Sequence, residues 1–133
     1  NMVLSTEKLT NNQQTVLDLL EKSKEPLKAY AILFDIQKKG IKAPLQVYRA
    51  LDKLIEIGKV HKIESRNSYI ACEHKNCDST TSTSFLICET CDQVTELKKK
   101  NLSGYFSKQS EQVNFKYEKH NLEIYGTCKD CTK

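Results

Sequence analysis

Four of the six cysteines form two pairs, and each pair has two residues between its members. The pairs are Cys88-Glu-Thr-Cys91 and Cys128-Lys-Asp-Cys131. A two-residue spacer lets both sulfurs of one turn face a single point, so two such turns can complete a tetrahedron of thiolates around zinc. The spacing therefore predicts a structural zinc site that joins the start of a domain to its end.

Other uses of paired cysteines fit the chain less well. No signal sequence points to an oxidising compartment, which argues against disulfides, and two separate redox C-x-x-C pairs in one small chain would be unusual. A zinc deaminase needs a H-x-E motif followed by P-C-x-x-C, and this pattern is missing. We therefore expect a protein that is not an enzyme, with a thiol-redox protein as the weaker alternative.

Charge is unevenly distributed along the 133 residues, which carry a net charge of +4. Residues 1–71 hold 12 lysines and arginines against 8 acidic residues, whereas residues 72–133 hold 9 of each. A basic first half favours a polyanion as its partner. Apolar runs are too short to cross a bilayer, so we expect no membrane partner and a cytoplasmic protein.

Helix signals dominate the first half. Gly40 and Gly58 are suited to end helices, whereas Pro26 and Pro44 suit first-turn positions. The pattern predicts three helices: one that opens at the capping box Thr10–Gln13 and ends near Ser23, one from Leu27 to Lys39, and one from Pro44 to Ile57.

The second and third helices, joined by a short turn that begins with glycine, match a helix-turn-helix motif. In that motif the first turns of the second helix reach base edges in the major groove of DNA. The candidate DNA-binding residues are Tyr48, Arg49, Gln46, Lys42 and Lys53. A three-helix bundle with solvated polar faces remains the alternative for this stretch.

Two alternating segments, 59–64 and 68–72, flank Ser65-Arg-Asn67 and predict a β-hairpin, which would complete a winged helix. A Ser/Thr-rich segment follows and indicates a linker. The second half predicts strands at 85–88, 94–97 and 115–125, and a helix from 101 to about 113. The fold class is therefore α+β: a winged helix-turn-helix domain at residues 1–72, a hinge linker at 73–84 and a small α/β dimerisation domain with the four-cysteine zinc site at 85–133.

The remaining metal-binding side chains gather near the predicted hinge. His61 and Cys72 lie on the two strands of the hairpin, while His74 and Cys77 lie in the linker. A mixed set of cysteine, histidine and carboxylate suits zinc better than iron or manganese. As a group they favour a second, more labile metal site, although for each residue taken alone a buried free cysteine or a surface histidine is the better interpretation.

Several blocks of the sequence resemble the Fur (ferric uptake regulator) family, and within it the zinc uptake regulator branch. They are Val47-Tyr-Arg-Ala-Leu-Asp-Lys-Leu54, His61-Lys-Ile-Glu-Ser65, Tyr69-Ile-Ala-Cys72, Phe85-Leu-Ile-Cys-Glu-Thr-Cys91 and His120-Asn-Leu-Glu-Ile-Tyr-Gly-Thr-Cys-Lys-Asp-Cys131. The resemblance implies a homodimer that binds a double-stranded DNA operator. It also places Tyr48 and Arg49 at base-reading positions.

For metals, the resemblance implies a structural zinc at the four paired cysteines and a regulatory zinc between the domains. His61, Cys72 and Glu96 match regulatory ligands. The histidine that usually supplies the fourth ligand is missing from residues 80–84, so Cys77, with His74 as the alternative, is expected to replace it. His120 matches a histidine that binds metal in some relatives, and we treat it as structural.

Taken together, these features predict a zinc-responsive repressor that binds palindromic operators of zinc-uptake genes as a metal-loaded dimer. An iron or peroxide sensor of the same family is the alternative.

Overall fold

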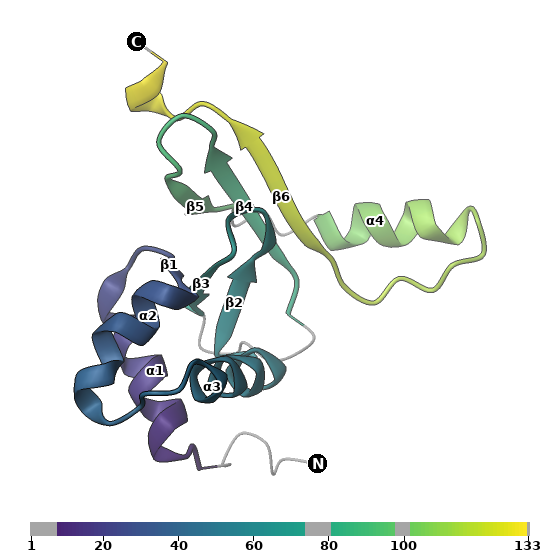
Figure 1. Cartoon of the computed structure of the whole chain (residues 1–133). Helices are drawn as coiled ribbons and strands as arrows, with labels where there is room; N and C mark the ends of the chain where they lie inside the picture. Colours follow the sequence, from purple (N-terminus) through teal and green to yellow (C-terminus); the bar gives the residue numbers. More distant parts are fainter. Residues whose placement is uncertain (1–7, 74–80, 98–101, 133) are drawn as a thin grey trace. The chain divides into compact units, whose positions relative to one another are not determined.

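The computed structural model describes residues 8–73, 81–97 and 102–132 (Figure 1). The chain divides into two compact units, Asn1–Ser79 and Thr80–Lys133. The predicted borders at 72, 84 and 85 remain a prediction. Along the chain the first unit contains α1 (Asn11–Ser23), β1 (Leu27–Lys28), α2 (Ala29–Ile36), η2 (Gln37–Lys39), α3 (Pro44–Glu56), β2 (Val60–Ile63), η3 (Glu64–Arg66) and β3 (Ser68–Ala71). The second contains β4 (Thr83–Cys88), β5 (Val94–Glu96), α4 (Leu102–Glu111), β6 (Asn121–Gly126) and η4 (Lys129–Cys131).

Helix α1 begins at the predicted capping box. The Gln13 N–H donates to Thr10 Oγ1 at 3.2 Å, and the Thr10 N–H donates back to Gln13 Oε1 at 3.0 Å. Two of the N–H groups that a helix leaves without intrahelical partners are thereby satisfied. One face of α1 is buried, and its residues include Val16 and Leu20.

Glycine and proline end and begin the next helices as expected. Gly40 has φ +99° and caps η2, the continuation of α2, while Gly58 has φ +82° just after α3. Pro44 occupies the first position of α3. The prediction for Pro26 was wrong, because Leu27 and Lys28 form strand β1 rather than the first turn of α2. The residue after a proline in an extended segment is free to pair with a strand, and here Leu27 lies opposite Tyr69.

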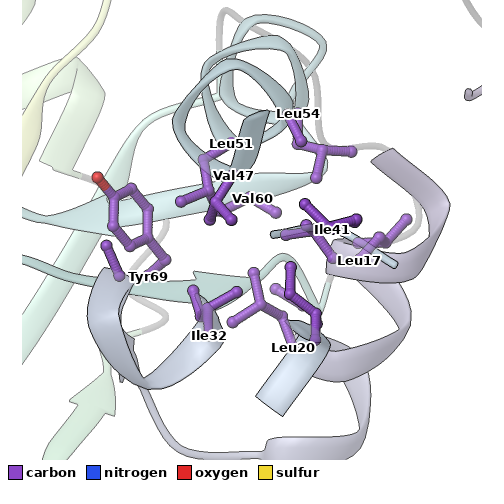
Figure 2. Close-up of a cluster of buried hydrophobic side chains, with 14 residues drawn as sticks. Leu17, Leu20, Ile32, Ile41, Val47, Leu51, Leu54, Val60 and Tyr69 are labelled. Atoms are coloured by element: carbon purple, nitrogen blue, oxygen red, sulfur yellow. The ribbon is translucent and has the colours of Figure 1, made fainter. Parts of the chain in front are cut away.

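The first unit closes around one hydrophobic core (Figure 2). Its sheet has the order β1-β3-β2, and both pairings are antiparallel. Strands β2 and β3 form the predicted hairpin, with Asn67 in the left-handed conformation at its turn. The helices and this sheet together bury side chains that include Leu20, Ile32, Val47, Leu51, Leu54, Val60 and Tyr69.

The second unit is built on a sheet of order β5-β4-β6, in which β4 pairs antiparallel with β5 and parallel with β6. The last strand is shorter than the predicted 115–125, because the partner strand β4 begins with Thr83 opposite Asn121. Helix α4 makes the crossover between β5 and β6, in agreement with the expected β-β-α-β order. Within the residues that the structure describes, none of the helices has the length and apolarity needed to cross a lipid bilayer.

Candidate metal centre and nucleic-acid interface

The parallel pairing of β4 and β6 brings the two cysteine pairs together. Parallel strands end at the same edge of a sheet. Cys88, the last residue of β4, lies opposite Gly126, the last residue of β6. The Glu89 N–H donates to the Gly126 carbonyl at 2.8 Å, which extends this pairing by one residue. Both cysteine turns therefore leave the sheet at one end.

Each turn is closed by its own backbone hydrogen bonds. In the first, the Asp92 N–H donates to the Cys88 carbonyl at 2.8 Å, and Asp92 takes a left-handed conformation with φ +66°. In the second, the Cys131 N–H donates to the Cys128 carbonyl at 3.0 Å. These short rings direct both sulfurs of a pair toward the same side, which is the geometry that the C-x-x-C spacing predicts.

The four sulfurs form one cluster. All four lie within 4.8 Å of one another, and Cys91 Sγ lies 3.7 Å from Cys128 Sγ. A tetrahedron with a Zn–S bond of about 2.3 Å has sulfurs about 3.8 Å apart. The four thiols are free of disulfides. Their number, type and spacing thus fit a tetrahedral zinc ion.

The pKa values of two of the thiols also favour binding of a cation at the centre of the cluster. The Cys128 N–H donates to Cys88 Sγ at 3.3 Å, and this bond is the main cause that lowers the pKa of Cys88 to about 6. In contrast, the hydrogen bond between the thiols of Cys131 and Cys128 is the main cause that raises the pKa of Cys131 to about 12. Without a cation the sulfurs cannot all be thiolates at neutral pH, whereas a divalent ion stabilises all four.

Helix α3 has the two faces of a recognition helix. Val47, Leu51 and Leu54 are buried, with exposures of 1% or less. Gln46, Tyr48 and Arg49 are exposed near the start of the helix. The structure thus gives these three side chains the accessibility that base reading requires.

The two lysines of the predicted DNA-binding set differ in their surroundings. Lys42 is exposed in the turn before α3. Lys53 is half-buried, and its ammonium forms an ion pair with Glu56 at 3.8 Å.

The predicted regulatory ligands of the first unit lie on neighbouring strands. His61 on β2 is opposite Ile70 on β3, and the Cys72 N–H donates to the Lys59 carbonyl at 2.9 Å, which continues the pairing. Directly opposed residues of antiparallel strands share a face. His61 and Cys72 are therefore diagonal neighbours on one face of the wing, within reach of a shared ligand. Cys72 is disulfide-bonded in this structure, so metal binding requires its reduced form.

The other predicted regulatory ligands lie elsewhere. Glu96 is half-buried at the end of β5, opposite Phe85. Cys77 and His74 lie outside the described residues. The regulatory set therefore remains a prediction.

His120 has the surroundings of a structural residue. Its Nδ1 lies 2.6 Å from the Tyr117 hydroxyl and its Nε2 lies 3.4 Å from Ser84 Oγ. The edge of its ring meets Phe106 of α4 with the centroids 5.0 Å apart. Burial lowers the pKa of the imidazole. His120 thus joins α4 to the sheet as a neutral ring.

Lys62 is a residue that the sequence reasoning did not select. Its ammonium lies over the Tyr69 ring, 5.8 Å from the ring centroid, beside Glu64 at 3.5 Å. The alternating pattern of β2 could have pointed to Lys62, because this residue lies on the same face of the strand as the fully buried Val60.

A winged helix followed by a unit closed with four cysteines defines a class of metal-binding, DNA-binding regulators. The model of the Ferric uptake regulator family matches residues 5–125, and the chain belongs to that family.

Particular relatives are regulators of zinc uptake by name. The chain is 32% identical over 127 residues to the Zinc uptake regulation protein of Escherichia coli (strain K12), which covers 95% of this chain and 74% of that protein. It also resembles the crystal structure of holo XcZur, with a TM-score of 0.83, 35% identity and coverage of 96% of this chain and 90% of that one. A zinc uptake regulator complexed with zinc and DNA matches with a TM-score of 0.84, 30% identity and coverage of 96% and 85%.

Proposed function

We propose that this protein is a zinc-responsive transcriptional repressor that acts in the cytoplasm and binds palindromic operators of zinc-uptake genes as a homodimer. The observation that carries the proposal is the exposed polar start of α3, supported from behind by a buried apolar face in a chain of this family. The relatives that bind zinc, or zinc together with DNA, support it.

Zinc at the four cysteines would have a structural role. Cys88, Cys91, Cys128 and Cys131 would hold it, because four thiolates in a tetrahedron select zinc over harder divalent ions. A thiol-redox function is less compatible with this geometry, because the two pairs converge on one point rather than standing apart.

The regulatory ligands in this proposal are His61, Cys72 and Glu96, with Cys77 or His74 as the fourth. Three of the four, whichever candidate is the fourth, belong to the first unit, and Glu96 belongs to the second. When bound there, zinc would supply a cross-link between the first unit, which would read DNA, and the second unit, which would form the dimer. Such a cross-link favours DNA binding only if the ligands hold zinc more tightly in the DNA-competent arrangement than in others.

The homodimer would form through the second unit. Among the residues that the structure describes, strand β6 is at an edge of the sheet, and an edge strand can offer its backbone to another strand. Leu86 and Ile124 lie opposite each other on one face and are each 38% exposed. A second copy that covered this face would bury apolar surface and would present two α3 helices to the two halves of a palindrome.

The test is a zinc titration of DNA binding. An operator duplex would first be selected from a random-sequence pool with the zinc-loaded protein, while sedimentation reports the oligomeric state and metal analysis reports zinc per chain. We expect two zinc ions per chain, a dimer, and a large loss of operator affinity when a chelator removes the weaker zinc.

Two variants separate the roles of the residues. Arg49→Ala should abolish selective operator binding and leave both zinc ions in place. Cys72→Ser should lose one zinc of the two and make DNA binding insensitive to added zinc.

Iron(II) in place of zinc tests the alternative of an iron sensor. Unchanged operator affinity after removal of the exchangeable zinc would refute the proposal.

A further inference from the structure

The hairpin of β2 and β3, which is the wing of the winged helix, packs beside α3 and carries a lysine ammonium that lies over an aromatic ring. Lys62 on β2 lies directly opposite Tyr69 on β3, and both side chains are on the face that packs against the helices. Tyr69 is only 4% exposed, whereas the side chain of Lys62 is 31% exposed. The ring therefore supports the partly exposed lysine side chain.

The same spot adjoins the reading face of α3. Helix α3 packs against β2. Burial raises the pKa of Tyr69, the Lys62 ammonium opposes this rise, and Tyr48 and Asp52 of α3 add to it. These contributions place Tyr69 near the side of α3 that carries Tyr48 and Asp52. Figure 2 shows its hydroxyl oxygen directed away from the buried aliphatic side chains.

We propose that Lys62 and the Tyr69 hydroxyl form a phosphate-binding pair in the angle between the recognition helix and the wing. The inference rests on the proposed DNA-binding function. At least half of the hydrogen bonds between proteins and DNA go to phosphate and sugar, so a cation beside a base-reading helix is suited to a phosphate contact. A lysine whose stem is held on a ring loses less conformational entropy when it binds than a fully mobile lysine does.

Glu64 is the competing anion in this pair. Its carboxylate lies 3.5 Å from the Lys62 ammonium and its side chain is 76% exposed. An exposed ion pair of this kind is weak and is screened by salt. The closely spaced phosphates of duplex DNA therefore displace this single carboxylate, and Glu64 lowers the affinity for DNA instead of contributing to it.

Salt dependence provides the test, because each phosphate contact contributes about 0.9 to the slope of log K against log salt concentration. The probes are a mixed-sequence duplex and the selected operator duplex, both titrated with full-length zinc-loaded protein over a series of salt concentrations. For Lys62→Ala we expect the slope to fall by about 0.9 for each head that contacts the DNA. Affinity for both duplexes should fall by the same factor, about fivefold per head at about 0.15 M salt.

Matched variants distinguish the pair from a general loss of charge. Lys22→Ala removes an exposed lysine from α1, outside the helix and the wing, and should leave the slope unchanged. Tyr69→Phe keeps the ring and removes a neutral donor, so it should lower affinity with the slope intact. Glu64→Gln should raise affinity for both duplexes. Zinc content and thermal unfolding, measured for every variant, confirm that each is folded.

Two failures have different meanings. If the wild-type protein binds neither duplex, the proposed function is wrong. If the wild-type protein binds both duplexes and the slope and affinity of folded Lys62→Ala match the wild type, the phosphate-binding pair is wrong and the proposed function stands. A Glu64→Gln variant with lower affinity than the wild type would also overturn the assignment of Glu64 as competitor.

Discussion

The two units differ in what holds them together. The first unit buries side chains from three helices and from strands β2 and β3 around one core. In the second unit, all the described residues that are buried belong to β4: Thr83, Ser84, Phe85, Ile87 and Cys88. A unit with so little interior cannot offset the entropy of folding by hydrophobic burial alone. We infer that the first unit depends on its core, and the second on its metal and its partner.

The largest effect should come from removing a metal ligand of the second unit. Cys128→Ser should release the tight zinc, whose binding in comparable small sites contributes about 10–16 kcal/mol. Hydrogen exchange with mass spectrometry should then show lost amide protection in β4 and β6, while α1 and α3 stay protected. Cys72→Ser is the matched control and should keep the tight zinc. Protected β4 and β6 in a zinc-free Cys128→Ser protein would contradict the comparison.

The same leucine-to-alanine change in each unit should give a smaller but measurable difference in the loss of stability. Leu54→Ala removes a side chain with 0% exposure from the core of the first unit and should lower its free energy of unfolding by about 2–5 kcal/mol. Leu86→Ala removes the same atoms from a side chain that is 38% exposed, so the loss in folding of an isolated chain should be under about 1 kcal/mol. Denaturant unfolding at low protein concentration measures both. Equal losses would show that the second unit has a core after all.

The smallest effect should be a pH dependence confined to the second unit. Burial lowers the pKa of His120 from its ordinary 6.5, so the folded unit disfavours the imidazolium form. The stability that the neutral ring contributes is complete above pH 6.5 and is lost as the pH falls from there toward the lowered pKa. Thermal unfolding of the wild type and of His120→Gln, compared at equal zinc content, should show a steeper decline for the wild type below pH 6.5. Parallel curves for the two proteins would exclude His120 as the cause.

Much of the first unit could be predicted from local signals. The capping box at Thr10, the glycines at 40 and 58 and the proline at 44 each act through the backbone of their own neighbourhood, so they can be recognised without the fold. Strand β1 could not be predicted in this way. It has two residues, too few for a periodic pattern, and it exists because β3 lies beside it.

The second unit shows the same limit for its last strand. Alternation extends from Phe115, but a strand also needs a partner, and β4 begins opposite Asn121. The Phe115 N–H instead donates to the Ser110 carbonyl at 2.9 Å, at the end of α4.

The candidate sites also differ in whether the sequence alone could predict them. The four cysteines could be predicted because metal geometry fixes the spacing within each pair, and the structure brings the pairs together. The position of Lys62 on Tyr69 could not, because it depends on the register between two strands and on the helix behind them.

The parallel pairing of β4 with β6 also has a consequence for the order of synthesis. Cys91 and Cys128 are 37 residues apart, and the whole of α4 lies between them. A nascent chain emerging from the ribosome therefore exposes half of the sulfur set well before the other half exists. Products of early translational stops after α4 would lack both β6 and the second cysteine pair. Their second unit could not fold, so cellular proteases would cleave them readily.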